Sequence, residues 1–253
     1  MTKSFRAQDV VHVGDRVHAV FGSDVTWVVV KDGDSATLID TGYPGDRQNL
    51  LASLESLGLA PEAVIAVLLT HAHNDHLGSA EHLRTAHGIP ILMHEDEVPH
   101  ARRDYLDQVT LGKVLANSWR PGVTPWALRA VRSGGTADVP VAEPRAFPGS
   151  GALDLPGNPV PVHTGGHTAG HCAYLLPDSG ILLCGDVLVT GHPTSRVAGP
   201  QILPAMFANR QRAAAALSTL ADLDADVLVP GHGPVHRGPV KAAVESARER
   251  VNA

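Results

Sequence analysis

Four side chains that can bind metal fall within six positions of the segment 70–76, which reads THAHNDH. In an extended loop, residues two apart point to the same side, so His71 and His73 can face one metal ion. Asp75 and His76 follow where the chain must turn, and they can face a second ion. Neutral imidazole and carboxylate are the usual non-thiolate ligands of zinc and related metals. The segment therefore predicts a metal site.

Other polar residues recur after short apolar segments typical of β-strands. These positions are Asp40, the segment 71–76, His167, Asp186 and His232. Strand ends at one edge of a sheet can converge, and ligands that are distant in sequence need a rigid scaffold to meet within about 2 Å of one ion. We therefore expect these positions to line one cleft.

The apolar and turn patterns predict the elements that hold these positions in place. Strands are expected at about 25–30, 36–39, 64–69, 89–93, 160–162, 173–176, 181–183 and 227–229. Helices are expected at about 46–58, 79–87, 204–220 and 239–251.

A less regular, mainly helical stretch runs from about 95 to 137. Its apolar positions include Leu106, Val109 and Val114, while Pro121 and Pro125 interrupt the pattern. Insertions of this kind often cover active sites. We expect one domain over residues 1–253, with this insertion lying over the active site.

Composition narrows the class of protein. The chain has 253 residues, 43% hydrophobic and 18% charged, which is typical of a soluble globular protein. A formal charge of −6 without a run of lysine or arginine argues against a nucleic-acid partner. No apolar run reaches membrane-spanning length, and no signal peptide is recognisable. We expect a cytoplasmic protein with a small-molecule substrate and no membrane partner, and the oligomeric state stays open.

The remaining candidate residues have ordinary alternative roles. Cys172 and Cys184 form no CxxC pair and lie beside apolar runs, so we expect buried thiols. His192, in a Gly-His-Pro segment after Asp186, is a candidate for the mouth of the cleft. Tyr43 is a candidate for the substrate pocket, with core packing as the alternative. We expect no metal binding by the histidines without a ligand-like context: His12, His18, His82, His87, His94, His100 and His236.

The order HxHxDH, GHTxGH, GD and GHG resembles the metallo-β-lactamase superfamily, in its branch similar to glyoxalase II and to lactonases. The resemblance covers roughly residues 11–233. It implies an α+β fold, the αββα sandwich, in which two mixed β-sheets pack together and helices cover the outer faces.

The same resemblance implies a set of site residues. It implies that a first ion is bound by His71, His73 and His167. It implies that a second ion is bound by Asp75, His76 and His232. Asp186 would bridge both ions, and Asp40 would bond a ligand histidine and fix its tautomer. His171 would give similar support without binding metal directly.

Such a site implies a hydrolytic mechanism without a serine or cysteine nucleophile. Two divalent ions about 3.5–4 Å apart lower the pKa of a bridging water, and the resulting metal-bridging hydroxide attacks a carbonyl carbon. One ion steadies the oxyanion. Asp75 would be the catalytic residue that orients the nucleophile and relays its proton. We expect zinc, with iron or manganese as alternatives.

Departures from the known branches narrow the substrate. Asp186 stands where the best-known secreted β-lactamases carry cysteine, and only 21 residues follow His232, where glyoxalase II has a helical region for glutathione. We therefore predict hydrolysis of an ester-like bond in a lactone, thioester or ester. The alternatives are a mononuclear iron persulfide dioxygenase, and a β-lactam-hydrolysing or non-catalytic metal-binding member of the same fold.

Overall fold

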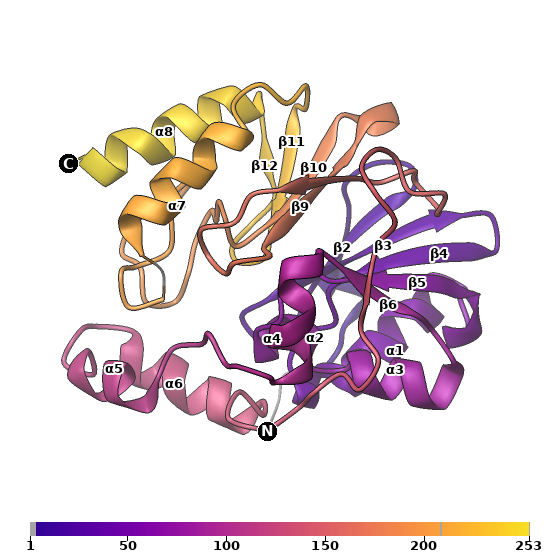
Figure 1. Cartoon of the computed structure of the whole chain (residues 1–253), viewed down its shortest axis with the longest axis horizontal. Helices are drawn as coiled ribbons and strands as arrows, with labels where there is room; N and C mark the ends of the chain where they lie inside the picture. The colour runs from indigo at the N-terminus through magenta and orange to yellow at the C-terminus, as the bar shows by residue number, and fades with distance from the viewer. Residues whose placement is uncertain (1–3, 208, 253) are drawn as a thin grey trace.

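Each half of the chain forms one β-sheet in the computed structural model, which describes residues 4–207 and 209–252 (Figure 1). The first sheet has seven strands in sequential order: β1 (Val10–His12), β2 (Val17–Phe21), β3 (Thr26–Asp32), β4 (Ser35–Ile39), β5 (Val64–Leu68), β6 (Ile91–Met93) and β7 (Arg145–Ala146). Strands β1 to β4 pair antiparallel, and β4 to β7 pair parallel.

The second sheet has five strands in the order β12 (His236–Arg237), β11 (Val227–Pro230), β10 (Ile181–Gly185), β9 (Cys172–Leu176) and β8 (Val160–His163). Only the β10–β11 pair in it is parallel. Both sheets are therefore mixed.

Helices cover the outer faces of the two sheets (Figure 1). The helices are α1 (Arg47–Ser56), α2 (Asn74–Leu77), α3 (Ala80–His87), α4 (Val98–Arg102), α5 (Leu111–Ala116), α6 (Val123–Arg132), α7 (Arg210–Ala216) and α8 (Val240–Asn252). Short 3₁₀ helices lie at Ala7–Asp9, Pro44–Asp46, Pro61–Ala63, Glu95–Glu97, Pro177–Ser179 and Leu217–Thr219. Helices α1 and α3 pack on the first sheet, and α7 and α8 pack on the second. This is the αββα sandwich that we expected.

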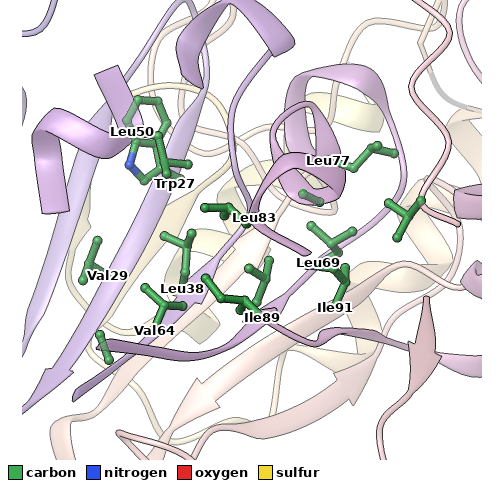
Figure 2. Close-up of a cluster of buried hydrophobic side chains, with 14 of the residues drawn as sticks. Trp27, Val29, Leu38, Leu50, Val64, Leu69, Leu77, Leu83, Ile89 and Ile91 are labelled. Atoms are coloured by element: carbon green, nitrogen blue, oxygen red, sulfur yellow. The ribbon is translucent and has the colours of Figure 1, made fainter. Parts of the chain in front are cut away.

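The two-residue period of β3 explains why the first sheet is buried on both faces. Trp27 and Val29 point outward and belong, with Leu50 of α1, to the buried cluster that Figure 2 shows. Val28 and Val30 point inward, toward the second sheet. A strand that packs on both faces needs an apolar run without polar alternation, which is what the sequence has here.

The second sheet repeats this arrangement. In β10, Ile181 and Leu183 join the core between the sheets, while Leu182 and Cys184 face α7 and α8. Cys172 lies in the core between the sheets, and both cysteines are buried and free. The expectation of two core thiols is confirmed.

One predicted helix begins later than expected. The pattern predicted a helix over about 204–220, but α7 begins at Arg210 and gives way to a 3₁₀ turn after Ala216. Asn209 caps the start, because its side chain accepts hydrogen bonds from the backbone N–H groups of Gln211 and Arg212 at 3.0 and 3.1 Å. The prediction was wrong for residues 204–207 and 209, and residue 208 lies outside the described residues.

The insertion from about 95 to 137 contains α4, α5 and α6. Helices α5 and α6 stand apart from the two sheets, on the side of the molecule toward which α7 also descends (Figure 1). Within the described ranges, no helix is both long and apolar enough to cross a membrane.

Candidate metal centre

The end of β4 turns toward the loop that follows β5, its parallel neighbour. Asp40 adopts a positive φ of 59°, which ends the strand there. Its Oδ1 accepts a hydrogen bond from the N–H of Thr70 at 2.8 Å, and its Oδ2 accepts one from the Thr70 hydroxyl at 2.7 Å. The same Oδ2 lies 2.8 Å from Nδ1 of His76, while the Thr70 hydroxyl lies 3.0 Å from Nδ1 of His71. Asp40 thus orients the loop and one of its histidines.

Three histidines form the first group of ligand atoms. Nδ1 of His73 lies 3.0 Å from Nε2 of His71 and 3.1 Å from Nε2 of His167. His71 and His73 come from the loop after β5, and His167 comes from the loop after β8. The two sheets therefore meet at this group, in which His71 and His167 are buried and His73 is 9% exposed.

A second group contains Asp75, His76 and His232. Oδ2 of Asp75 lies 3.4 Å from Nε2 of His232 and 3.9 Å from Nε2 of His76. Asp75 and His76 lie in the short helix α2, which begins directly after His73. His232 follows β11, so this group also draws on both sheets.

Asp186 lies between the two groups. Its Oδ2 is 3.5 Å from Nε2 of His167 and 3.2 Å from Nε2 of His232, and its Oδ1 is 3.5 Å from Nε2 of His76. A carboxylate in this position can bind both ions. The backbone of residue 231 lies so close to Asp186 and His76 that only glycine fits there. A Cβ at Gly231 would collide with Oδ1 of Asp186 and with the His76 ring.

The donor set fits divalent metal ions. Nε2 of His76 and Oδ1 of Asp186 are buried and, among the residues that the structure describes, have no hydrogen-bond partner. An unsatisfied pair of this kind is costly inside a protein, and a bound ion would satisfy both atoms. Imidazole nitrogen and carboxylate oxygen suit zinc, iron, manganese or cobalt.

The electrostatics of the centre also suit cations. Burial holds the pKa of His71 and His167 well below that of free histidine, so both rings keep a free lone pair. Burial also opposes the charge on His232, but the Asp186 carboxylate outweighs it and raises the pKa of His232 to about 10. The carboxylates thus hold protons on nearby histidines, and metal ions would displace those protons on binding.

Two further ligand histidines are oriented by backbone carbonyl groups. Nε2 of His73 lies 2.6 Å from the carbonyl oxygen of Asp107, and Nδ1 of His232 lies 2.6 Å from that of Asp24. In each ring the N–H donates to the carbonyl, which leaves the other nitrogen free to face the centre.

His171 supports Asp186 and belongs to neither ligand group. Its Nε2 accepts a hydrogen bond from the backbone N–H of Asp186 at 3.0 Å, and its Nδ1 lies 2.7 Å from the hydroxyl of Thr164. Both ring nitrogens are thus engaged. Burial lowers the pKa of His171 to about 4, so the ring stays neutral.

Glu97 joins the two ligand loops, and sequence reasoning missed it. Its Oε1 accepts a hydrogen bond from the N–H of Ala72 at 2.8 Å and lies 2.8 Å from Nδ1 of His100. Its Oε2 accepts hydrogen bonds from the Thr168 hydroxyl at 2.8 Å and the N–H of Gly170 at 3.0 Å. Glu97 ends an acidic tripeptide that reads as a solvated helix start, so no local signal marks it.

The insertion is attached to the metal-binding loop at both of its ends. The Nδ2 group of Asn74 donates hydrogen bonds to the carbonyl oxygens of Gly135 and Ala137 at 2.9 and 2.8 Å. Nη2 of Arg103 donates to Oδ1 of Asn74 at 2.7 Å. A residue between two ligands, His73 and Asp75, therefore fixes the insertion.

A cavity of about 500 Å³ opens beside the metal-binding residues. The ligands that reach its wall are His73, Asp75, His167, Asp186 and His232. Apolar side chains of the insertion and of the segment before α7 form much of the rest, among them Val109, Val114, Trp126, Ala127, Leu203 and Phe207. Tyr43 and His192, the two candidate pocket residues, also lie on the wall.

A third group of ligand-type residues lies at the surface, away from this cavity. It contains His94, Asp96 and His163. The two rings stack face to face, with centroids 3.9 Å apart and planes at 10°. Their in-plane lone pairs therefore lie in two nearly parallel planes and cannot both point at one ion.

Comparison with known proteins agrees with this geometry. The model of the Metallo-beta-lactamase superfamily matches residues 20–232. The chain is 27% identical over 210 residues to metallo-beta-lactamase domain-containing protein 1 of Xenopus laevis, covering 83% of this chain and 71% of that protein. It is 25% identical over 221 residues to the probable metallo-hydrolase YflN of Bacillus subtilis, covering 79% of this chain and 75% of that protein.

A hydroxyacylglutathione hydrolase of Alkalilimnicola ehrlichii is 31% identical over 178 residues, which cover 68% of this chain but only 49% of that enzyme. A metallo-beta-lactamase family protein of Thermus thermophilus superimposes with a TM-score of 0.65 at 24% identity, covering 90% of this chain and 74% of that one. MEM-A1, a subclass B3 metallo-beta-lactamase from a soil metagenome, superimposes with a TM-score of 0.66 at 18% identity, covering 98% of this chain and 95% of that one. The fold, the two buried groups of histidine and aspartate, and the family match lead to one conclusion: the chain belongs to the metallo-β-lactamase superfamily, as a metallo-hydrolase.

Proposed function

We propose that this protein hydrolyses an ester-like bond, in a lactone, thioester or ester, of a substrate that carries an apolar group. The observation that carries the proposal is the position of the ligand groups on the wall of a largely apolar cavity. Substrate sites of this kind combine apolar walls with a few polar groups that fix orientation.

Two divalent ions are proposed, most simply zinc. His71, His73 and His167 would hold one ion, and His76 and His232 would help hold the other. When bound, the ions supply a nucleophile from water at neutral pH and a Lewis acid for the carbonyl oxygen. The complete second group, with Asp75, favours two ions over the single iron of a dioxygenase.

Asp75 is the proposed proton carrier. Its side chain is 18% exposed, the most open of the carboxylates at the centre, and it lies on the cavity wall. Burial opposes its charge, but His76 and His232 outweigh that effect and lower its pKa, so the group is a carboxylate at neutral pH. Oδ2 of Asp75 can accept the proton of the attacking water and pass it to the leaving oxygen or sulfur.

The apolar wall selects the substrate and excludes water. Trp126 and Phe207 pack edge to face, with ring centroids 5.0 Å apart, and Val109 and Val114 lie around them. An aliphatic or aromatic group of the substrate would be buried here, at about 25 cal/mol for each Å² removed from water.

The curated relatives support a thioester as the substrate class. Hydroxyacylglutathione hydrolases are named for cleaving a glutathione conjugate, but the chain matches only about half of their length. The likeness to β-lactamases lies at 18% identity and supports the shared fold alone.

The test begins with protein purified without chelator or added metal. Elemental analysis should find close to two ions per chain. A panel of aliphatic esters, thioesters and lactones of increasing chain length should then show turnover that a chelator abolishes and zinc restores. About one iron per chain, with sulfur-dependent oxygen uptake and no hydrolysis, would overturn the proposal in favour of a dioxygenase.

A further inference from the structure

His192 stands at the boundary between the metal-binding residues and the apolar part of the cavity. Its ring lies edge to face with the ligand His232, at a centroid distance of 5.0 Å and an angle of 87°. On the other side it contacts Phe207 at 4.8 Å and Trp126 at 5.7 Å. The side chain is 9% exposed and lies on the cavity wall.

Hydrogen bonds to Thr194 fix the tautomer of this ring. The backbone N–H of Thr194 donates to Nδ1 of His192 at 3.2 Å, so Nδ1 carries a lone pair. The Thr194 hydroxyl lies 2.7 Å from the same atom and donates to it as well. The proton of the neutral ring must therefore be on Nε2.

The free edge of the ring is a hydrogen-bond donor. Nε2 makes no hydrogen bond to the rest of the described chain, and it lies on the edge away from Thr194. Because Nε2 carries the proton, it has no lone pair for a metal ion.

We propose that the Nε2–H of His192 donates a hydrogen bond to the oxygen of the scissile carbonyl, and that Thr194 is the positioning residue that presents this donor. The inference rests on the proposed hydrolase function and deepens it. A preorganised donor in a water-excluded site acts most strongly where charge develops in the transition state.

The step balances without a change in the protonation of His192. The oxygen of water forms a bond to the carbonyl carbon, and the carbonyl π electrons move to the oxygen that faces Nε2–H. The proton of the water passes to Asp75. When the carbonyl re-forms, the bond to the leaving oxygen or sulfur breaks, and Asp75 returns the proton to it. The substrate must then lie with its apolar group beside Trp126 and Phe207.

The test compares His192→Leu, which removes the donor, with His192→Gln, which keeps an N–H donor. Both are assayed, fully metal-loaded, on the best substrate of the wild-type enzyme. His192→Leu should lower kcat about 100- to 1,000-fold with little change in KM. His192→Gln should recover most of that loss, and Thr194→Val should lower kcat less than His192→Leu. His87→Gln, a surface change, is the matched control.

A binding measurement gives a readout independent of turnover. An alkyl phosphonate resembles the tetrahedral transition state, whereas the corresponding alkyl alcohol carries only the apolar group. By calorimetry, His192→Leu should weaken phosphonate binding by a factor similar to its loss in kcat/KM, and alcohol binding should not change. Equal weakening of both ligands would make His192 a packing residue and overturn the proposal.

The outcomes separate this inference from the proposed function. If the wild-type enzyme hydrolyses no ester, thioester or lactone, the proposed function fails and the role of His192 fails with it. If the wild-type enzyme is active and His192→Leu keeps kcat within twofold, only the role of His192 fails. Loss of metal from folded His192→Leu would make the residue a ligand and also overturn it.

Discussion

Nε2 of His73 lies 2.6 Å from the backbone carbonyl oxygen of Asp107, so the insertion that lines the cavity also orients a candidate metal ligand. The donated proton leaves Nδ1 of His73 as the nitrogen that faces His71 and His167. The insertion and the candidate metal centre therefore form a single structural unit, joined again through Asn74.

Replacing Asn74 with alanine should weaken the connection between the insertion and the candidate metal centre. Asn74→Ala removes the hydrogen bonds to Gly135 and Ala137 and the one that Nη2 of Arg103 donates to Asn74. We expect about tenfold weaker metal affinity, the range found for partners of metal ligands, together with a higher KM. Competition with a chromogenic chelator measures the affinity. Asn117→Ala, directly after α5, is the control and should change neither quantity.

Asp186→Asn should reduce metal binding and turnover while the protein still folds. The amide loses the charge that faces His232, His76 and His167, so one ion should be lost and kcat should fall about 100-fold or more. Elemental analysis and kinetics measure the two effects, with Asp178→Asn in an exposed turn as the control. Retained activity with both ions bound would contradict the bridging role.

Glu97→Gln should destabilise the protein in a pH-dependent way. Burial opposes the charge of Glu97, but His100 and the donors around the carboxylate outweigh it and lower its pKa. A carboxyl group whose pKa is lowered by folding stabilises the folded state at pH values above its ordinary pKa near 4.5. That contribution is lost as the pH falls through the folded-state pKa.

We therefore expect Glu97→Gln to cost about 3 kcal/mol at pH 7, the scale for breaking a buried pair, and much less at an acidic pH below the lowered folded-state pKa of Glu97. Urea unfolding with chelator present at both pH values isolates this effect from metal binding. Glu95→Gln, in the same acidic tripeptide but exposed, should be neutral. An equal loss at both pH values would show that the carboxylate charge is not the cause.

Both cysteine thiols should be unreactive in the folded protein. Burial raises the pKa of the Cys172 thiol to about 12 and that of Cys184 well above its ordinary value. Native protein should therefore react with iodoacetamide at pH 8 far more slowly than unfolded protein, as mass spectrometry can follow. Cys172→Ser should leave kcat within about twofold, because the thiol lies in the core between the sheets. A large loss of kcat in folded protein would revive a cysteine mechanism.

The grouping of the candidate ligand side chains and the strands that hold them were predictable, because both carry local signals in the sequence. Strands such as β3 and β10 pack on both faces and therefore appear in the sequence as apolar runs. The spacing HxHxDH can be recognised in the sequence without knowing the fold. The carbonyl oxygen of Asp107 has no such signal, since every residue has a carbonyl group. Glu97 was hidden for a related reason: its partners Thr168 and Gly170 are brought to it only by the packing of two sheets.

Each sheet is one continuous stretch of chain, and each ligand group draws on both. During synthesis, the first half leaves the ribosome with His71, His73, Asp75 and His76 but can complete neither group. The last ligand, His232, emerges after β11. Neither group of candidate ligands can therefore be complete until the second half of the chain has been synthesised and its sheet packs against the first.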